Sequence, residues 1–184
     1  LPKTAWPPTW ETVIMRAADI FMSFPSMILI LVLVSVFDPS VWTIIFVIGI
    51  LGWTDFAKLI YGNVLSVREK EYVESAKAVG TKDLTILVKY VIPNAFAPIL
   101  INFTFRTAQA IIQESSLSFL GMGVQPPEAS WGNILYAAQS ITVLSSRPWL
   151  WVPAGILLVL TVSSINFIGD GLRDALDSKT KIKK

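Results

Sequence analysis

The stretch "EYVESAKAVGTKDLTILVKYVIPN", residues 71–94, decides the fold. Here a charged segment whose apolar residues repeat with the period of an α-helix interrupts an otherwise hydrophobic chain. One face of the helix that it predicts is apolar and consists of Tyr72, Val73, Ala76 and Val79. On the other face Glu74 lies four residues after Lys70 and three before Lys77, so its charges pair with one another. Gly80 follows where a left-handed helix end costs least. The stretch therefore predicts a short amphipathic helix that ends at a glycine hinge.

A second helix is expected after the hinge, and it leads into the next apolar region. Thr81 is a residue type that caps helices. The apolar stripe predicted for this second helix consists of Leu84, Leu87, Val88 and Val91. Pro93 then marks the entry into the apolar region.

The composition is that of a membrane protein. Of the 184 residues 53% are hydrophobic and 15% charged, against roughly 25% charged in an average soluble domain, and the mean hydropathy is +0.61. The chain has no Cys and no His, so it lacks thiolate chemistry and the commonest metal ligand and general base. We therefore expect no catalytic site, no metal site and no bound cofactor. The net charge of +2 is too small to indicate a nucleic-acid partner.

Four segments approach the roughly 20 apolar residues that a membrane span requires. They lie at about residues 13–37, 41–60, 94–113 and 149–168. Pro25 predicts a kink within the first of them. The expected fold is all-α and polytopic, a single transmembrane domain over residues 1–184 with connections at 61–93 and 114–148.

Basic residues predict the orientation of the spans, since cytoplasmic connections carry an excess of Lys and Arg. Six lie around connection 61–93, namely Lys58, Arg68, Lys70, Lys77, Lys82 and Lys89. Five lie in the tail, namely Arg173, Lys179, Lys181, Lys183 and Lys184. The turn at residues 38–40 has none, and segment 114–148 has only Arg147. The pattern predicts that both ends of this chain are cytoplasmic and that segment 114–148 is external.

The spacing around Gly80 resembles a motif of ATP-binding-cassette importer permeases, "EAA, three residues, G, nine residues, I-x-L-P". Glu74, Ala76, Gly80 and Pro93 occupy its fixed positions. Three positions depart mildly from the motif, with Ser75 for the second residue, Tyr90 for the Ile and Ile92 for the Leu. The motif lies between two predicted spans, on the face predicted to be cytoplasmic.

Three further stretches narrow the resemblance to permeases of the oligopeptide, dipeptide and nickel importer group. These are "MRAADIFMSFP" (15–25), "SSLSFLGMGVQPPEASWGN" (115–133) and "NFIGDGLRDALD" (166–177). The resemblance implies a MetI-like permease fold and the C-terminal part of the second of two permease subunits. It also implies that one or two further spans and an external loop precede this chain in the whole protein.

The resemblance also implies a mechanism and partners. Such permeases lie in the plasma or inner membrane, pair with a second permease, receive solute from an external binding protein and dock on cytoplasmic ATPase subunits. This chain has no Gly-x-x-x-x-Gly-Lys-Ser/Thr loop, so ATP hydrolysis is expected in those partners and not here. The residues expected to contact or position the ATPase are Tyr72, Val73, Glu74, Ser75, Ala76, Val79, Gly80 and Pro93, with the apolar face buried in the ATPase cleft. Peptide import is the expected activity; nickel or another small solute, and a self-contained channel or carrier, are the alternatives.

A candidate translocation path lies in the third predicted span. Asn102, Arg106, Gln109 and Gln113 fall within an arc of about 60° on a helix of 3.6 residues per turn. Facing lipid at mid-depth, Arg106 would cost roughly 2.5–3.5 kcal/mol on insertion scales, so it is expected to face protein or water. A packing role, with Arg106 bound to neighbouring helices, remains the alternative.

The external segment 114–148 contains the apolar, glycine-containing sequence "LSFLGMGV". Ser130 is expected to cap a helix that runs to about Ile141–Leu144. Two placements are open for this segment: it re-enters the membrane, or it packs over the bundle as a lid.

Overall fold

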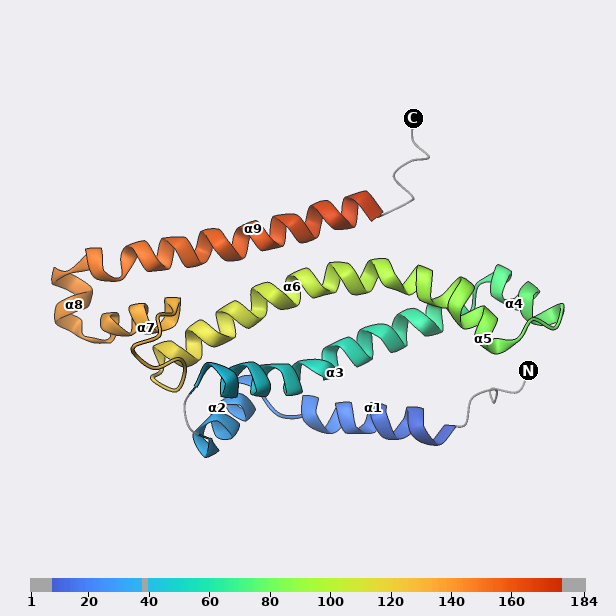
Figure 1. Cartoon of the computed structure of the whole chain (residues 1–184), viewed down its shortest axis with the longest axis horizontal. Helices are drawn as coiled ribbons and strands as arrows, with labels where there is room; N and C mark the ends of the chain where they lie inside the picture. The colour runs from blue at the N-terminus through green and yellow to red at the C-terminus, as the bar shows by residue number, and fades with distance from the viewer. Residues whose placement is uncertain (1–7, 38–39, 177–184) are drawn as a thin grey trace. The chain divides into compact units, whose positions relative to one another are not determined.

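All the regular structure in the described part of the chain, residues 8–37 and 40–176 of a computed structural model, is helical. This confirms the all-α prediction. In chain order the elements are α1 (Pro8–Met22), α2 (Ser26–Val36), α3 (Val41–Arg68), α4 (Glu71–Ala78), α5 (Asp83–Ile86), the π-helix η1 (Leu87–Val91), α6 (Ile92–Phe119), α7 (Trp131–Tyr136), the 3₁₀ turn η2 (Ala137–Gln139), α8 (Ile141–Ser146), the 3₁₀ turn η3 (Pro148–Leu150) and α9 (Val152–Leu176) (Figure 1). The predictions for Asp38 and Pro39, and for Lys179, Lys181, Lys183 and Lys184, concern residues outside the described ranges.

Within the described ranges three stretches of helix are long and apolar enough to cross a membrane, Val41–Arg68, Asp83–Phe119 and Pro148–Leu176. A fourth span results if the broken pair Trp10–Met22 and Ser26–Val36 counts as one. At Pro25 the predicted kink is a full interruption, because residues 23–25 lie in no helix. Proline disfavours the helical conformation of the residue before it, which explains why α1 ends ahead of Phe24.

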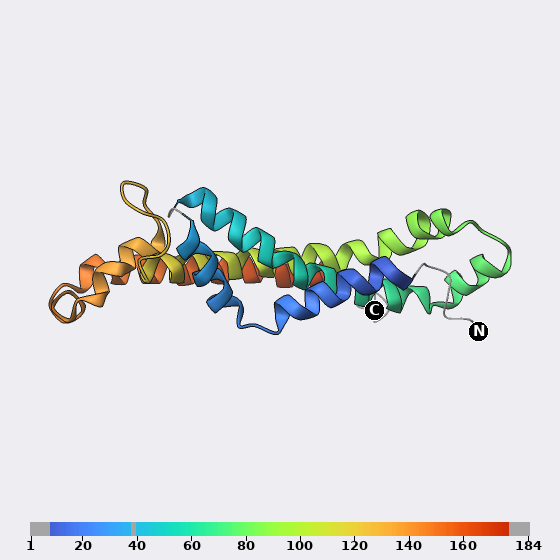
Figure 2. The ribbon, with the colours of Figure 1, turned by 90° about the horizontal axis from the view of Figure 1, so that it is seen from below.

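The residue contacts divide the chain into two compact units, and the first contains the residues up to Phe24 together with Gly52–Asn102. In this unit α1 lies alongside the second half of α3 (Figures 1 and 2). Ala18 is fully buried, and the rings of Phe21 and Trp53 meet edge to face with centroids 6.3 Å apart. A small core joins the end of α3 to α4, α5 and η1, formed by Val67, Val73, Ala76, Ile86 and Val91.

The second unit contains Pro25–Leu51 and the residues from Phe103 onward. Its core joins α2, the first half of α3 and the end of α6, through Ile30, Val34, Ile44, Val47, Leu117 and Val124. Helix α9 runs back along the second part of α6 (Figure 1). Gly169 of α9 permits this approach, since a Cβ there would lie 2.4 Å from Thr104 Oγ1.

The second helix of the opening stretch differs from its prediction. Lys82, not Thr81, is the residue that precedes α5, and no side chain caps it. Ile86 and Val91 are buried, while Leu84 and Val88 are 71% and 57% exposed. The stripe prediction is thus confirmed for Val91 and for Leu87, which packs against the core, and wrong for Leu84 and Val88. Val88 lies in the π-helix of residues 87–91, whose wider turn shifts the faces away from the α-helical period.

Segment 114–148, which is predicted to be external, begins with a second glycine-terminated helix end. Gly121 has φ +79°, and Met122 N donates to Leu117 O at 2.9 Å. Ser130 caps α7 as predicted, in a reciprocal pair with Asn133, but α7 ends at Tyr136 and α8 is a separate helix. A Cβ on Gly132 would lie 2.2 Å from Ser115 O, so α7 packs directly on the end of α6. Helix α7 thus covers the end of α6, and the placement of this segment relative to the membrane remains a prediction.

Candidate functional site

Helix α4 forms because its charges and its ends suit a short helix. Glu71 and Glu74 lie in the first turn and Lys77 in the last, which is the favourable arrangement for the helix dipole. The amides of Val73 and Glu74 both donate to Lys70 O, at 2.9 and 3.1 Å, and so satisfy two of the free N–H groups at the start.

The hinge after α4 has the predicted left-handed conformation. Gly80 has φ +78°; its amide donates to Lys77 O at 2.9 Å, and Thr81 N donates to Ala76 O at 3.0 Å. These two bonds make a Schellman motif, which satisfies the last carbonyls of the helix. No atom lies within 4 Å of the position that a Cβ on Gly80 would take. The glycine is therefore required by its backbone conformation and not by a lack of space.

The predicted apolar face of α4 is split between the inside and the outside of the chain. Val73 is 1% exposed and Ala76 9%, and both pack against Val67, Ile86 and Val91. In this conformation Val73 and Ala76 are therefore inaccessible to another protein, which corrects the expectation that they enter a partner's cleft. The end of α3 and the π-helix cover Val73 and Ala76. A helical wheel of α4 cannot show this, because it includes no residue of another element.

The outer side of α4 is what remains accessible. Val79 is 82% exposed and Tyr72 40%, while Glu74 and Ser75 are also exposed. We call Tyr72, Glu74, Ser75 and Val79 the outer surface of α4. Tyr72 is partly held by Tyr90 of η1, with ring centroids 5.9 Å apart. Pro93 is exposed in the first turn of α6.

Two core residues of this site, Val67 and Ile86, were absent from the sequence-based site. Both are apolar residues close to the predicted helix, and that proximity is the only sequence signal for them. The core holds α4 against the end of α3, α5 and η1, since Val67, Ile86 and Val91 of those elements pack on its buried residues.

The polar stripe on α6 is partly linked along its own helix. Arg106 Nη1 donates to Gln109 Oε1 at 3.0 Å, which places these two side chains on one face. Arg106 and Gln113 are half-buried and Gln109 is exposed. Asn102, in the first unit, has a buried Oδ1 with no hydrogen-bond partner among the described residues. Its role in a path remains a prediction, as does that of the other three residues.

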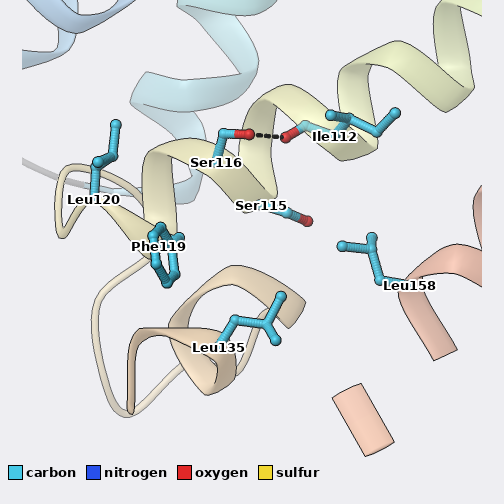
Figure 3. Close-up of a pocket in the computed structure, with 7 residues that line it drawn as sticks. All are labelled: Ile112, Ser115, Ser116, Phe119, Leu120, Leu135 and Leu158. Atoms are coloured by element: carbon cyan, nitrogen blue, oxygen red, sulfur yellow. Dashed lines mark hydrogen bonds between the residues drawn. The ribbon is translucent and has the colours of Figure 1, made fainter. Parts of the chain in front are cut away.

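A cavity of about 340 Å³ lies in the second unit where α6, α7 and α9 meet (Figure 3). Its lining residues are Ile112, Ser115, Ser116, Phe119, Leu120, Leu135 and Leu158. Ser116 Oγ donates to Ile112 O at 2.8 Å, and Ser115 Oγ makes a long bond of 3.4 Å to Glu114 Oε2. Because both hydroxyls are engaged and no charged side chain lines the cavity, it suits an apolar group and not acid–base chemistry.

Within residues 8–37 and 40–176 no group of three or more Asp or Glu side chains has the arrangement of a metal site. The arrangement around α4 is instead mechanical. A short helix is fixed from beneath by a core, ended by a glycine and presented at one end of two long apolar helices.

Comparison with known proteins supplies the family. Residues 4–182 match the family described as "Binding-protein-dependent transport system inner membrane component". A Brucella ovis protein named as a candidate peptide permease is 41% identical over 172 residues, which are 94% of this chain and 57% of the relative. The glutathione transport system permease protein GsiD of Escherichia coli O6:K15:H31 is 38% identical over 172 residues, which are 94% of this chain and 56% of the relative.

The chain thus spans a little over half the length of the relatives that it matches. The match nevertheless covers almost the whole of this chain, including α4, the hinge and every candidate span. The chain is a multi-pass component of the inner membrane, and it belongs to the family of binding-protein-dependent transport system inner membrane components.

Proposed function

We propose that this chain is part of a permease subunit of an ATP-binding-cassette importer that moves short peptides inward across the inner membrane. Family membership supports the importer class. The names of two relatives, a candidate peptide permease and a glutathione transport permease, support a peptide substrate, since glutathione is itself a tripeptide. The apolar helices Val41–Arg68, Asp83–Phe119 and Pro148–Leu176 supply the spans.

The partners follow from this importer class. They are a second permease, with which this subunit forms a heterodimer, cytoplasmic ATPase subunits, an external solute-binding protein and the surrounding lipid. Both ends of the chain lie in the cytoplasm in this proposal, because the basic residues gather in connection 61–93 and in the tail. The chain is not itself an enzyme; ATP is bound and hydrolysed by the partner ATPase.

The observation that carries the coupling role is the split face of α4. Val73 and Ala76 hold the helix on the chain by their burial, while Tyr72, Glu74, Ser75 and Val79 lie on its accessible side. A rigid, short and exposed helix is what a partner needs in order to push on the spans, because a displacement of α4 is passed through packed side chains to α3 and α6. The outer surface of α4 therefore contacts the ATPase. Gly80 marks the end of the helix that is displaced, and Pro93 marks the start of α6, to which the displacement is passed.

The polar stripe of α6 is proposed to line the path. Arg106, Gln109 and Gln113 would be expensive in lipid, so a water-filled side of the helix suits them. The apolar cavity beside α7 lies at the end of α6 that is external in this proposal.

Two matched substitutions test the coupling surface in the full-length permease, co-expressed with its partner subunits. Val79→Asp places a charge on the outer surface of α4, and Ile141→Asp does the same on α8; both native side chains are 82% exposed. We expect Val79→Asp to abolish co-purification of the ATPase and ATP-driven uptake, and Ile141→Asp to leave both at the wild-type level. Retention of the ATPase by Val79→Asp would refute the docking role of this surface.

The substrate is tested through the external binding protein. Mass analysis of the solutes that co-purify with it should show di- to oligopeptides, and labelled peptide should accumulate in vesicles only when ATP is supplied inside. A binding protein loaded with nickel alone would replace the peptide assignment by the nickel alternative. Uptake that persists without any ATPase subunit would instead indicate a self-contained carrier.

A further inference from the structure

A charged contact joins α1 to α3 within the first unit. Lys58 Nζ donates a hydrogen bond to Asp19 Oδ1, and Arg16 Nη1 lies 3.7 Å from the other carboxylate oxygen, Oδ2. Further along the same two helices, Tyr61 of α3 interacts with Glu11 of α1. The two helices are thus held together by directional polar contacts.

Stability does not account for this charged contact. The side chains of Lys58 and Asp19 are 36% and 46% exposed, and ion pairs at such exposure contribute little to stability. Apolar contacts already join the helices, through the buried Ala18 and the edge-to-face pair of Phe21 and Trp53. Ionisable groups on helices that enter a membrane are costly and usually functional. The contact therefore calls for a role beyond holding the unit together.

The position of Lys58 on α3 indicates the role. Helix α3 continues without interruption from Lys58 to Val67 and ends at Arg68. Val67 belongs to the same core as Val73 and Ala76 of α4. A displacement of α4 therefore reaches Lys58 through one packed core and about two and a half turns of helix. Apolar burial between α1 and α3 is non-directional, whereas the Asp19–Lys58 pair joins one defined position on each helix.

We propose that the Asp19–Lys58 ion pair, assisted by Arg16, is the positioning contact that makes α1 move together with α3 when the coupling helix α4 is displaced. The proposal rests on the importer function proposed above. It assigns a role in transmission to Asp19 and Lys58, which are not among the predicted site residues. Loss of the pair leaves α4 able to bind its partner but uncouples α1 from the movement.

Charge reversal in the complete importer, reconstituted with its partner subunits, tests the transport consequence. Asp19→Lys and Lys58→Asp each place like charges in contact, and we expect each to lower ATP-driven uptake of labelled trialanine about tenfold, within the range of typical coupling effects. The amount of assembled complex stays unchanged, and more ATP is hydrolysed per peptide moved. The double variant Asp19→Lys/Lys58→Asp restores the pair in reverse and recovers most of the uptake. If the charge-reversal variants do not assemble with the partner subunits, the neutral variants Asp19→Asn and Lys58→Gln are used in their place.

A matched control is available on α9, where Asp170 and Arg173 are exposed charges three residues apart. Asp170→Arg and Arg173→Asp are expected to leave uptake unchanged. Hydrogen–deuterium exchange of the purified permease tests the contact between α1 and α3 without a transport assay. The single charge reversals at Asp19 and Lys58 should raise the exchange rate in α1 but not in α4. The double variant should return the exchange rate in α1 to the wild-type value.

The outcomes separate the two proposals. If the wild-type importer showed no ATP-driven uptake, the proposed function would be refuted. The hydrogen–deuterium exchange measurement would still show whether the ion pair joins α1 to α3. A double variant as impaired as the single variants would overturn the pairing, and so would a loss of uptake that merely follows a loss of assembled complex. Another outcome is that the variants change only which peptides are transported, according to the charge of the peptide termini. That result would mean that Asp19 and Lys58 contact the substrate, and it would also overturn the proposed positioning role.

Discussion

The Val124 amide donates a hydrogen bond of 2.9 Å to Ser118 Oγ, and this bond closes the turn that follows α6. The same hydroxyl donates to Glu114 Oε1 at 2.6 Å. Ser118 is 2% exposed and Val124 6%, so neither group has water as a ready substitute. One buried hydroxyl thus ties a span to the segment that packs over its end.

Ser118→Ala should lower the free energy of unfolding by about 1–3 kcal/mol, because it leaves the buried Val124 amide without its acceptor. Thermal unfolding of the full-length permease in detergent measures the change. Ser116→Ala is the control, since the Ser116 hydroxyl bonds to Ile112 O of its own helix; its effect should stay within about 0.5 kcal/mol. Equal effects of the two substitutions would contradict the role given to Ser118.

Gly132→Ala should destabilise the packing of α7 on the end of α6 by about 1–3 kcal/mol or prevent it, as overpacking does in a well-packed core. Its Cβ would lie 2.2 Å from Ser115 O and 2.8 Å from the Ser115 carbonyl carbon, and backbone atoms cannot move aside as a flexible side chain does. Gly171→Ala meets no atom within 4 Å and serves as the control. Proteolysis of segment 120–147 reports the docking, and faster cleavage is expected only for Gly132→Ala.

Val73→Ala should cost about 2 kcal/mol, the value for two buried methyl groups together with the space that they leave. Val79→Ala, at a side chain that is 82% exposed, should have almost no effect on stability. The comparison is made by thermal unfolding of the permease without its partners. If Val79 proved the more destabilising position, the assignment of the inner and outer sides of α4 would be reversed.

Gly80→Ala should weaken the end of α4 by about 1–2 kcal/mol, because a residue with a Cβ is strained at positive φ. Gly62→Ala in α3 is the matched control. At both glycines the added Cβ has no atom within 4 Å, but of the two only Gly80 has a positive φ. Trypsin cleavage after Lys77 and Lys82 reports the local opening. Gly62→Ala should leave the cleavage rate unchanged, and a similar acceleration by both variants would show that backbone conformation is not the cause.

Much of the fold follows from local sequence. The spans at α3, α6 and α9 follow from runs of apolar residues, since a membrane requires length and hydropathy that a sequence displays directly. The helix ends at Gly80 and Ser130 follow from residue types whose backbone or side chain suits one conformation. The break at Pro25 follows from the constraint that proline places on its predecessor.

The candidate site was less accessible to sequence analysis. A helical wheel assigned Val73, Ala76 and Val79 to one face, and the structure separates them, with Val73 buried and Val79 exposed. The difference arises from Val67, Ile86 and Val91, which approach α4 from other elements. The π-helical turn at residues 87–91 also shifted a predicted stripe, because its turn is wider than the one assumed.

Neighbouring residues alone are enough to specify the membrane class, the long apolar helices and the glycine hinge after α4, because each depends on local composition or on one residue type. Tertiary packing, in contrast, is needed to show which side of α4 is accessible and that Asp19 meets Lys58. The accessible side of α4 depends on Val67, Ile86 and Val91 of other elements, and Asp19 and Lys58 are 39 positions apart in the chain. Such pairings depend on how helices pack, and no local pattern of residues specifies them.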